Sequence, residues 1–595
     1  MTVLPRSEYP RPQFRRSEWV CLNGKWGFEI DRGDSGLERG LRDRELRSEI
    51  TVPFCPESEL SGVEDIDFLT AVWYRRTIEI PQQWAGQRVL LHFGAVDYDA
   101  TVWADGVEVA RHRGGFTPFT ADLGERTGAV TVVVRARDSR DTPQPRGKQS
   151  ARYEKYGCLY TRTTGIWQTV WAEPVPTVHL RRPRITPDLG AGAFHVELPL
   201  SNNRPGYTVR AVLSDGQGEV ATATARADLD LSPRLYLPIP EDRRRLWGPG
   251  QPNLYDLTFE LLDADGAVVD TVESYAGLRS VAIDGQRILI NGEPVFQRLV
   301  LDQGYYPDGV MTAPSDEALK RDIELSIAAG FNGARLHQKV FEERFLYHAD
   351  QLGYLVWGEF GDWGCHATEL SGGAVSDNNQ QPGPSYITEW LEALERDYSH
   401  PSIVGWCPLN ETRQRIGDRI RVLDDVTRGM FLATKAMDAS RPVLDASGYS
   451  HRVRETDVYD SHNYEQDPAE FARQMSGLAS GTPYANRDEP APWSVPYTGQ
   501  PYFCSEFGGI WWSPGATGHS WGYGERPKTL EEFYARFEGL CDALLDDPAM
   551  FGYCYTQLTD VHQEENGIFR FDRAEKFDLE RIRKVQTRQA AIERS

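Results

Sequence analysis

The chain has 595 residues, more than one hydrophobic core holds, and its length predicts about three or four domains. Its 88 acidic and 65 basic residues give a net charge of -23, which repels nucleic-acid phosphates and anionic membranes. No window reaches the roughly 18 to 20 consecutive apolar residues of a membrane span, and the N-terminus has no apolar signal segment. We therefore expect a soluble, cytoplasmic protein that binds neither nucleic acid nor membrane.

The first part of the chain has the pattern of a β-sandwich. Runs such as AVTVVVRARD (129–138) cluster β-branched residues and are separated by Asp-Gly, Gly-Gly and Pro turns. This pattern predicts a jelly-roll sandwich over residues 1–178. Weaker strand patterns follow a segment rich in Pro and charge, and they predict a smaller, immunoglobulin-like sandwich over residues 179–280.

From residue 281 to 595 strand-like runs alternate with helical ones, which indicates a (β/α)8 TIM barrel. The clearest helix begins at a Ser315 or Asp316 cap and stops at Gly330. The expected fold is thus multidomain, with two sandwiches before the barrel. The eight predicted barrel strands are 296–304, 333–337, 354–360, 403–411, 442–448, 458–464, 502–508 and 550–558.

The cysteines give no sign of a metal site or a disulfide framework. Eight of them are scattered without C-x-x-C pairs, and several lie inside apolar runs. Free buried thiols are the expected state. We predict neither a metal nor an organic cofactor.

Two glutamates end apolar runs of the predicted barrel. Glu411 closes the fourth predicted strand and Glu506 lies in the seventh, so both carboxylates should emerge at the C-terminal mouth, where barrel enzymes keep their chemistry. Either glutamate alone has an alternative explanation as a salt-bridge partner or helix cap. Together they predict cleavage of a glycosidic bond, with retention of configuration at a separation of about 5 to 5.5 Å and inversion at about 6.5 to 9.5 Å.

The chain resembles the family 2 glycoside hydrolases, which include bacterial β-galactosidases and β-glucuronidases. The resemblance runs from LNGKWGFEI (22–30) through GLRSVAIDGQRILINGEPVFQR (277–298) to SHPSIVGWCPLNE (399–411) and FCSEFGG (503–509). It implies that Glu411 is the general acid/base and Glu506 the nucleophile. It also implies that Asn410 hydrogen-bonds the sugar 2-hydroxyl and that Tyr464 supports the nucleophile, although Tyr464 has an alternative as an aromatic of the barrel rim.

Further polar residues stand at the ends of predicted strands, where they can hold a sugar. Aromatic residues after the third and seventh strands, Trp363, Trp511 and Trp512, can stack on it, with core packing or loop anchoring as the alternative. Arg335 has an alternative as an ion-pair partner of Glu506 or Glu359. The predicted sugar-binding residues are Asn410, Asp302, Arg335, His337, Glu359, His462, Trp512 and Asp560.

The sequence departs from the family pattern at strand ends that are expected to bind the sugar. RLVLDQGYYP (298–307) and RLHQK (335–339) replace the usual first and second strand ends, and Lys339 is an added cation. EFGDWG (359–364) lacks the second carboxylate and the histidine of the magnesium-dependent galactosidases. The Asn-x-Lys that reads a uronate carboxylate is not visible in NGIFRFDR (566–573).

The leading hypothesis is a retaining exo-glycosidase that removes a terminal, β-galactoside-like sugar from an oligosaccharide or other glycoside. A furanoside (galactofuranoside or arabinofuranoside) and a β-glucuronide are alternatives with the same mechanism. A non-catalytic carbohydrate-binding protein on an inactive barrel is the alternative of another class. The sequence leaves the oligomeric state open, and an exposed edge of either sandwich offers a route to a homo-oligomer.

Overall fold

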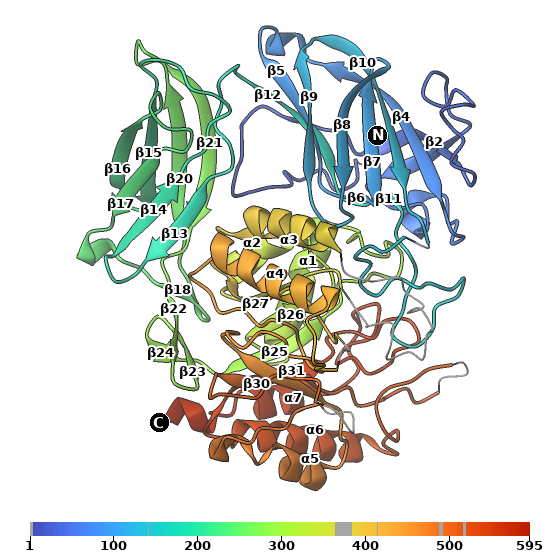
Figure 1. Cartoon of the computed structure of the whole chain (residues 1–595), viewed down its shortest axis with the longest axis vertical. Coiled ribbons are helices and arrows are strands. Elements are labelled where there is room, and N and C mark those ends of the chain that lie inside the picture. The colour runs from blue at the N-terminus through green and yellow to red at the C-terminus, as the bar shows by residue number, and fades with distance from the viewer. Residues whose placement is uncertain are drawn as a thin grey trace.

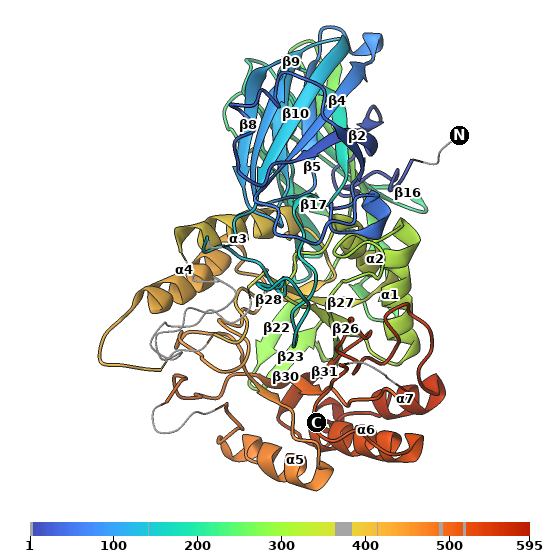
Figure 2. The same cartoon turned by 90° about the vertical axis from the view of Figure 1, so that its right-hand side faces the viewer.

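The computed structural model describes residues 4–140, 142–362, 383–412, 415–486, 492–515 and 519–594. Two β-sandwiches lie side by side on one side of a helix-covered barrel (Figure 1). In both views the helices α5, α6 and α7 lie on the side of the barrel away from the sandwiches (Figures 1 and 2). The predicted multidomain fold, jelly-roll sandwich, immunoglobulin-like sandwich and TIM barrel, is confirmed. We propose 1–178, 179–280 and 281–595 as the domain boundaries.

The N-terminal sandwich packs a four-stranded sheet against a six-stranded one. Its longest pairing joins β10 and β4 over their full length, from Gly128 opposite Ile80 to Arg137 opposite Ala71. The four-stranded sheet has the order β1 (Val20–Cys21), β12 (Val170–Val175), β5 (Arg88–Phe93), β9 (Phe119–Glu125). The six-stranded sheet has the order β3 (Ser48–Val52), β2 (Gly24–Ile30), β4 (Ala71–Ile80), β10 (Gly128–Arg137), β7 (Asp99–Ala104), β8 (Val107–Arg113), and a small pair joins β6 (Val96–Asp97) to β11 (Gly165–Ile166).

The second sandwich shows the alternation expected of half-buried strands. In β15 every second residue is buried, from Val209 to Asp215, because successive side chains point to opposite faces. Its three-stranded sheet has the order β13 (Arg184–Asp188), β14 (Ala193–Glu197), β17 (Arg234–Pro238). Its four-stranded sheet has the order β16 (Gly218–Arg226), β15 (Thr208–Asp215), β20 (Tyr255–Leu262), β21 (Val268–Ala276). Short strands lead into the barrel: β18 (Trp247–Gly248), β19 (Gln251–Pro252), β22 (Val281–Asp284), β23 (Arg287–Ile290), β24 (Glu293–Pro294).

The barrel strands are parallel and buried at nearly every position, because helices cover one face and packed side chains fill the other. The sheet order is β28 (Ile403–Cys407), β27 (Leu355–Glu359), β26 (Gly333–Leu336), β25 (Gln297–Asp302), β31 (Met550–Thr556), β30 (Tyr502–Gly508), β29 (Tyr459–Asn463). The helices are α1 (Asp316–Ala328), α2 (Glu343–Leu352), α3 (Pro384–Asp397), α4 (Val422–Met437), α5 (Pro468–Met475), α6 (Leu530–Leu545), α7 (Leu579–Gln586).

Helix α1 begins where the sequence predicts. The Ser315 hydroxyl accepts a hydrogen bond from the Ala318 amide, which satisfies one of the donors that a helix N-terminus leaves open. The helix ends at Ala328, and Gly330 follows with a left-handed φ of +95°. The helix therefore begins at the predicted serine cap and ends just before the predicted glycine.

The fifth predicted strand, 442–448, forms only isolated parallel bridges to the fourth, Trp406 to Val443 and Asn410 to Ser447. On its other side, the Asp457 amide donates to the Val443 carbonyl at 3.1 Å, and side chains supply further bonds. The Val443 amide donates to the Asp457 carboxylate at 2.9 Å, and the Asp445 amide donates to the Thr456 hydroxyl at 3.2 Å. The segment closes the barrel without being a regular strand.

The thiol prediction is confirmed for the cysteines that the structure describes. Seven of them are free, and five of these are buried; Cys365 lies outside the described residues. Across the described part of the chain, none of the helices has the length and apolar character that crossing a bilayer requires.

Candidate active site

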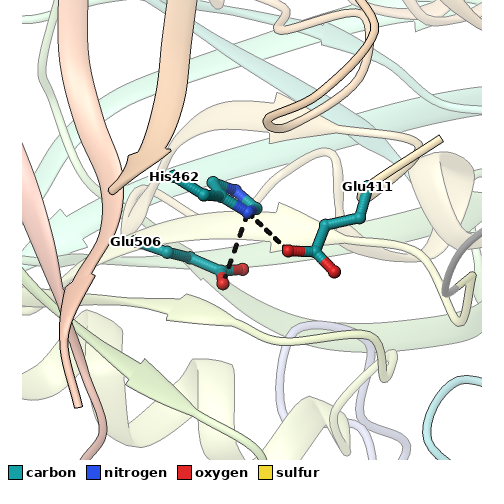
Figure 3. Close-up of side chains that lie close together, drawn as sticks. All are labelled: Glu411, His462 and Glu506. Atoms are coloured by element: carbon teal, nitrogen blue, oxygen red, sulfur yellow. Dashed lines mark hydrogen bonds and ion pairs between the residues drawn. The ribbon is translucent and has the colours of Figure 1, made fainter. Parts of the chain in front are cut away.

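Three side chains meet at the C-terminal mouth of the barrel: Glu411 beyond β28, His462 in β29 and Glu506 in β30 (Figure 3). His462 and Glu506 are register partners, with an irregularity in the pairing just before them. Glu411 has a left-handed backbone, with a φ of 49°, and its amide donates to the Ser447 carbonyl at 2.8 Å. A left-handed backbone at a non-glycine residue costs about 1 to 2 kcal/mol of conformational free energy. The rest of the fold offsets this cost and so fixes the position of the Glu411 carboxylate.

The two glutamates lie close enough to act on one bond. His462 Nδ1 is 2.8 Å from Glu411 Oε1 and 3.4 Å from Glu506 Oε2 (Figure 3). Carboxylate oxygens of the two glutamates lie within 4.8 Å of each other. This bound agrees better with the about 5 to 5.5 Å of retaining glycosidases than with the about 6.5 to 9.5 Å of inverting enzymes.

His462 lies between the two carboxylates, which favour the charged form of its imidazole. Burial lowers the pKa of its imidazole, but the charges of Glu506 and Glu411 outweigh burial, so the pKa is raised overall. Its Nε2 contacts the Ser447 hydroxyl at 2.9 Å, and that hydroxyl donates to the Asp460 carboxylate at 2.8 Å. The Ser447 oxygen is thus placed to accept a hydrogen bond from the Nε2–H group, which orients the ring with Nδ1 toward the glutamates.

Glu506 is held by two further groups. The Tyr464 hydroxyl donates to Oε2 at 2.7 Å, and Arg335 Nη2 is 3.3 Å from Oε1. The Tyr464 ring stacks on Tyr523, with centroids 3.5 Å apart and planes 5° from parallel. Burial and the Glu506 charge raise the pKa of Tyr464 well above its usual value, so its hydroxyl stays protonated and donates.

Arg335 is completely buried and directs its donors at protein groups. Nε donates to Glu359 Oε2 at 2.8 Å, Nη1 to the Ser505 carbonyl at 2.7 Å and Nη2 to Asn410 Oδ1 at 2.7 Å. These contacts match the ion-pair alternative for Arg335. Glu359 is likewise enclosed by Arg335 and by the amide of Gln338, which donates to Oε1 at 3.0 Å. Neither side chain is directed at open space.

Asn410 and His337 complete the floor of the site. Asn410 Nδ2 is buried and has no hydrogen-bond partner among the described residues, so it can donate to a ligand hydroxyl. His337 lies 3.0 Å from Glu359 and 3.9 Å from Glu506. Burial and the Lys148 charge lower the pKa of His337 well below its usual value, which makes it a neutral neighbour of the site.

Three of the predicted sugar-binding residues lie in other surroundings. The Asp302 carboxylate accepts from the Gly304 amide at 2.9 Å, and burial followed by the Asp322 charge raises its pKa to about 7. Asp560 binds Lys576 Nζ at 2.6 Å. Trp512 belongs to the core, in agreement with its alternative.

Two further aromatic predictions concern Trp363 and Trp511. Trp363 lies outside the described residues. Trp511 donates from Nε1 to the Ser520 hydroxyl at 3.0 Å and faces the Arg526 guanidinium at 5.4 Å. Loop residues therefore hold this ring, as the loop-anchoring alternative expects.

Sequence reasoning missed residues that the N-terminal sandwich sends to the barrel mouth. Lys148 is buried, and the charges of Glu564, Glu506 and Glu411 act on its ammonium group. The Tyr160 hydroxyl donates to the Glu564 carboxylate. No local motif marks these residues, since they lie more than a hundred positions before the barrel strands they meet.

Models of three domain families match the chain. They are the sugar binding domain of glycosyl hydrolases family 2 at residues 20–138, glycosyl hydrolases family 2 at 178–279 and the TIM barrel domain of the same family at 281–494. These matches follow one another through both sandwiches and into the barrel.

Similar proteins carry two kinds of name. A β-glucuronidase of Paenibacillus borealis is 29% identical over 427 residues, 68% of this chain and 69% of that protein. A β-glucuronidase of Canis lupus familiaris is 26% identical over 476 residues, 73% of this chain and 69% of that protein. A β-galactosidase of Thermoanaerobacter pseudethanolicus is 25% identical over 356 residues, 58% of this chain and 44% of that protein.

The solved structure of the β-glucuronidase from Ruminococcus gnavus in complex with D-glucaro 1,5-lactone is similar in fold. It superposes with a TM-score of 0.76 at 19% identity, covering 96% of this chain and 99% of that one. At this identity the likeness concerns the arrangement of the three domains.

Proposed function

This chain belongs to family 2 of the glycosyl hydrolases, and on that premise we propose that it is a retaining exo-glycosidase that releases a terminal β-glucuronic acid from a glycoside. The observation that carries the mechanism is the pair of carboxylates, Glu411 and Glu506, with oxygens within 4.8 Å of each other at the barrel mouth. That distance suits a covalent intermediate.

In the first step a Glu506 oxygen attacks the anomeric carbon while Glu411 gives its proton to the leaving oxygen. The bond from the anomeric carbon to the leaving oxygen breaks, an ester to Glu506 forms and the aglycone departs as an alcohol. In the second step Glu411, now ionised, takes a proton from water, and the water oxygen displaces Glu506. Two inversions at the same carbon give net retention.

The surrounding groups position this pair. Arg335 and Tyr464 each contact one oxygen of Glu506, so they fix the orientation of its carboxylate. His462 contacts both carboxylates through Nδ1 and so fixes their relative positions. We assign the unpartnered amide of Asn410 to a sugar hydroxyl next to the anomeric centre. Arg335, His337 and Glu359 are assigned to positioning.

The names of similar proteins support a glucuronide more than the galactoside that leads the sequence interpretation. The relatives from Paenibacillus borealis and Canis lupus familiaris are β-glucuronidases, and the Ruminococcus gnavus enzyme is bound to a glucaro-lactone. The Thermoanaerobacter pseudethanolicus relative supports the galactoside. Since the sequence lacks the Asn-x-Lys pattern after the eighth strand, a group elsewhere has to meet the carboxylate.

Two variants and a substrate panel test the proposal. Glu506→Ala should lose at least about 10³-fold in kcat, and azide should restore turnover with an inverted glycosyl azide as product. Glu411→Gln should lose about 10² to 10⁴-fold on p-nitrophenyl glycosides. Glu465→Gln, whose carboxylate accepts from the Gln466 and Asp467 amides, is the control for a glutamate outside the pair.

The panel contains the p-nitrophenyl β-glucuronide, β-galactoside, β-galactofuranoside and α-arabinofuranoside. We expect the glucuronide to be hydrolysed fastest, with the β-anomer released first in NMR spectra. Faster hydrolysis of a galactoside or furanoside would overturn the sugar assignment and leave the mechanism intact. Full activity of either glutamate variant would overturn the mechanism and favour a carbohydrate-binding role.

A further inference from the structure

Two groups of the barrel fix the place of His462. A Cβ at Gly448 would lie 2.8 Å from Cγ, Cδ2 and Cε1 of the imidazole, and the φ of this glycine is +66°. Equal distances to three ring atoms place Gly448 against the face of the ring, and both features require glycine there. The side chain of Asn486 pairs with the His462 main chain, since Oδ1 accepts from its amide at 2.9 Å and Nδ2 donates to its carbonyl at 2.8 Å. The ring that contacts both carboxylates in Figure 3 is therefore held in one position.

The direction of the hydrogen bond between His462 and Ser447 is decided by Asp460, which is buried and surrounded by donors. Asp460 Oδ2 accepts from the hydroxyls of Ser447, at 2.8 Å, and Ser505, and Oδ1 accepts from the Gly448 amide at 2.9 Å. A hydroxyl has one proton, and a hydrogen bond to a carboxylate is about twice as strong as one between neutral groups. The Ser447 proton therefore goes to Asp460, and the Ser447 oxygen accepts from the Nε2–H group of His462 at 2.9 Å.

A second pair of a histidine and an aspartate lies behind Asp460. His451 Nε2 is 3.1 Å from Asp460 Oδ1, and His451 Nδ1 is 2.9 Å from Asp445 Oδ1. Asp445 in turn accepts from the backbone amides of Arg452 and Val453 at 2.7 and 2.8 Å. Burial raises the pKa of the Asp460 carboxyl, but the contact with His451 outweighs burial, and the pKa is lowered overall. Both oxygens of Asp460 therefore remain acceptors.

We propose that Asp460 is a positioning residue for the catalytic pair and that it acts through Ser447 and His462. Because it takes the Ser447 proton, it holds the imidazole in the Nε2–H form. This turns Nδ1 toward the two glutamates, 2.8 Å from Glu411 Oε1 and 3.4 Å from Glu506 Oε2, and helps to set the separation of the carboxylates on which retention depends. The inference rests on the proposed glycosidase mechanism, which it deepens by naming a buried group that acts on the pair through other residues.

Replacing Asp460 with asparagine should reverse the hydrogen bond between Ser447 and His462. The Gly448 amide needs an acceptor, so the new side chain turns its oxygen to that amide and its NH2 group to the Ser447 oxygen. The Ser447 proton then points at Nε2, which has to lose its hydrogen in order to accept. The imidazole takes the opposite tautomer with little change of shape. The corresponding exchange in Ser-His-Asp enzymes acts through the tautomer in this way.

The test is a double-mutant cycle on the p-nitrophenyl glycoside that the wild type hydrolyses fastest, so it does not depend on which sugar that is. Asp460→Asn should lower kcat/KM by roughly 10- to 100-fold, and Ser447→Ala should lower it by roughly 5- to 20-fold. In a His462→Asn background, which lacks the imidazole, either change should cost less than about twofold more. Losses that multiply in full in that background would indicate a purely structural role and overturn the inference.

Asp350→Asn is the matched control. Asp350 is also completely buried and also pairs with a histidine, His400, whose Nδ1 lies 2.6 Å from Oδ2. His400 precedes the start of β28 and so lies at the end of the barrel opposite to the mouth. This exchange should lower the Tm and change kcat/KM of the folded enzyme by less than about twofold in both backgrounds.

Thermal unfolding identifies a variant that fails to fold, and Ser447→Ala carries the test if Asp460→Asn is lost in this way. A Ser447→Ala enzyme with wild-type kcat/KM would show that the contacts behind His462 do not act on the catalytic pair, and the inference would be wrong. A wild type that hydrolyses none of the four glycosides of the panel would instead overturn the proposed function, and the inference with it.

Discussion

Replacing Tyr464 with phenylalanine removes one hydroxyl group from the site and leaves the ring in place. That hydroxyl donates to Glu506 Oε2 at 2.7 Å and lies 2.9 Å from the Thr556 hydroxyl. A hydrogen bond to a charged group contributes about 1.5 to 3 kcal/mol. With 1.36 kcal/mol for each factor of ten, kcat/KM should fall by roughly 10- to 150-fold. Stacking of the ring on Tyr523 should preserve the fold.

The leaving group distinguishes loss of the nucleophile's support from loss of the proton donor. The 2,4-dinitrophenolate leaving group departs without being protonated. Departure of p-nitrophenolate is accelerated by a proton donor. Because Tyr464 contacts Glu506, Tyr464→Phe should lower kcat/KM by the same factor for both substrates. Glu411→Gln should lower it mainly for the p-nitrophenyl glycoside.

Tyr555→Phe is the matched control. Tyr555 is buried in β31, and its hydroxyl has no hydrogen-bond partner among the described residues. Removing this hydroxyl should change kcat/KM by less than about twofold. If Tyr464→Phe behaved like Tyr555→Phe, Tyr464 would be an aromatic of the barrel rim, and the reasoning from the hydroxyl contact would be refuted.

Three further predictions concern the site and its surroundings. His462→Asn should lower kcat/KM by about 10- to 100-fold and move the alkaline limb of the pH–rate profile upward, because a cation beside the proton donor is lost; an unmoved limb would contradict this. EDTA should leave activity unchanged, whereas Zn²⁺ should compete with substrate, because Glu411, His462 and Glu506 offer ligand atoms within 4.8 Å of one another; a chelator-sensitive enzyme would contradict this. Burial raises the pKa of Glu57 to about 8 from 4.5, so the native state keeps a proton that the unfolded chain releases, and this residue lowers stability as pH rises through that window. Glu57→Gln should therefore match the wild-type Tm at pH 5 and exceed it at pH 9, and a difference that does not depend on pH would contradict this.

The barrel and its two glutamates were predictable because their signals are local. Buried parallel strands read as apolar runs, and a carboxylate that ends such a run emerges at the mouth. β28 and β30 begin where the sequence predicts, at Ile403 and Tyr502. The distance between the carboxylates was not predictable, because it depends on the barrel's curvature and on the left-handed backbone at Glu411.

Position at a strand end does not determine what a side chain contacts. Asp302 ends β25, yet its carboxylate turns back to the Gly304 amide two residues later. Trp512 follows the nucleophile strand and packs near Phe533 and Phe577, with ring centroids 6.2 and 6.4 Å away. Local turns and core packing compete for such residues, and a single sequence does not show which of these competing interactions prevails.

The carboxylate pair and the loop at the barrel mouth depend on contacts of different sequence separation. Glu411 and Glu506 are brought together by one sheet whose strands follow a regular pattern, so the reaction class can be inferred from short motifs. A loop of the N-terminal sandwich reaches the barrel mouth only because Gly147 and Tyr160 dock it onto the barrel of another domain. Such a contact leaves no periodicity in the sequence. Exchanging residues 142–164 between relatives should therefore leave the β-anomer as the first product, because configuration depends on the glutamate pair alone.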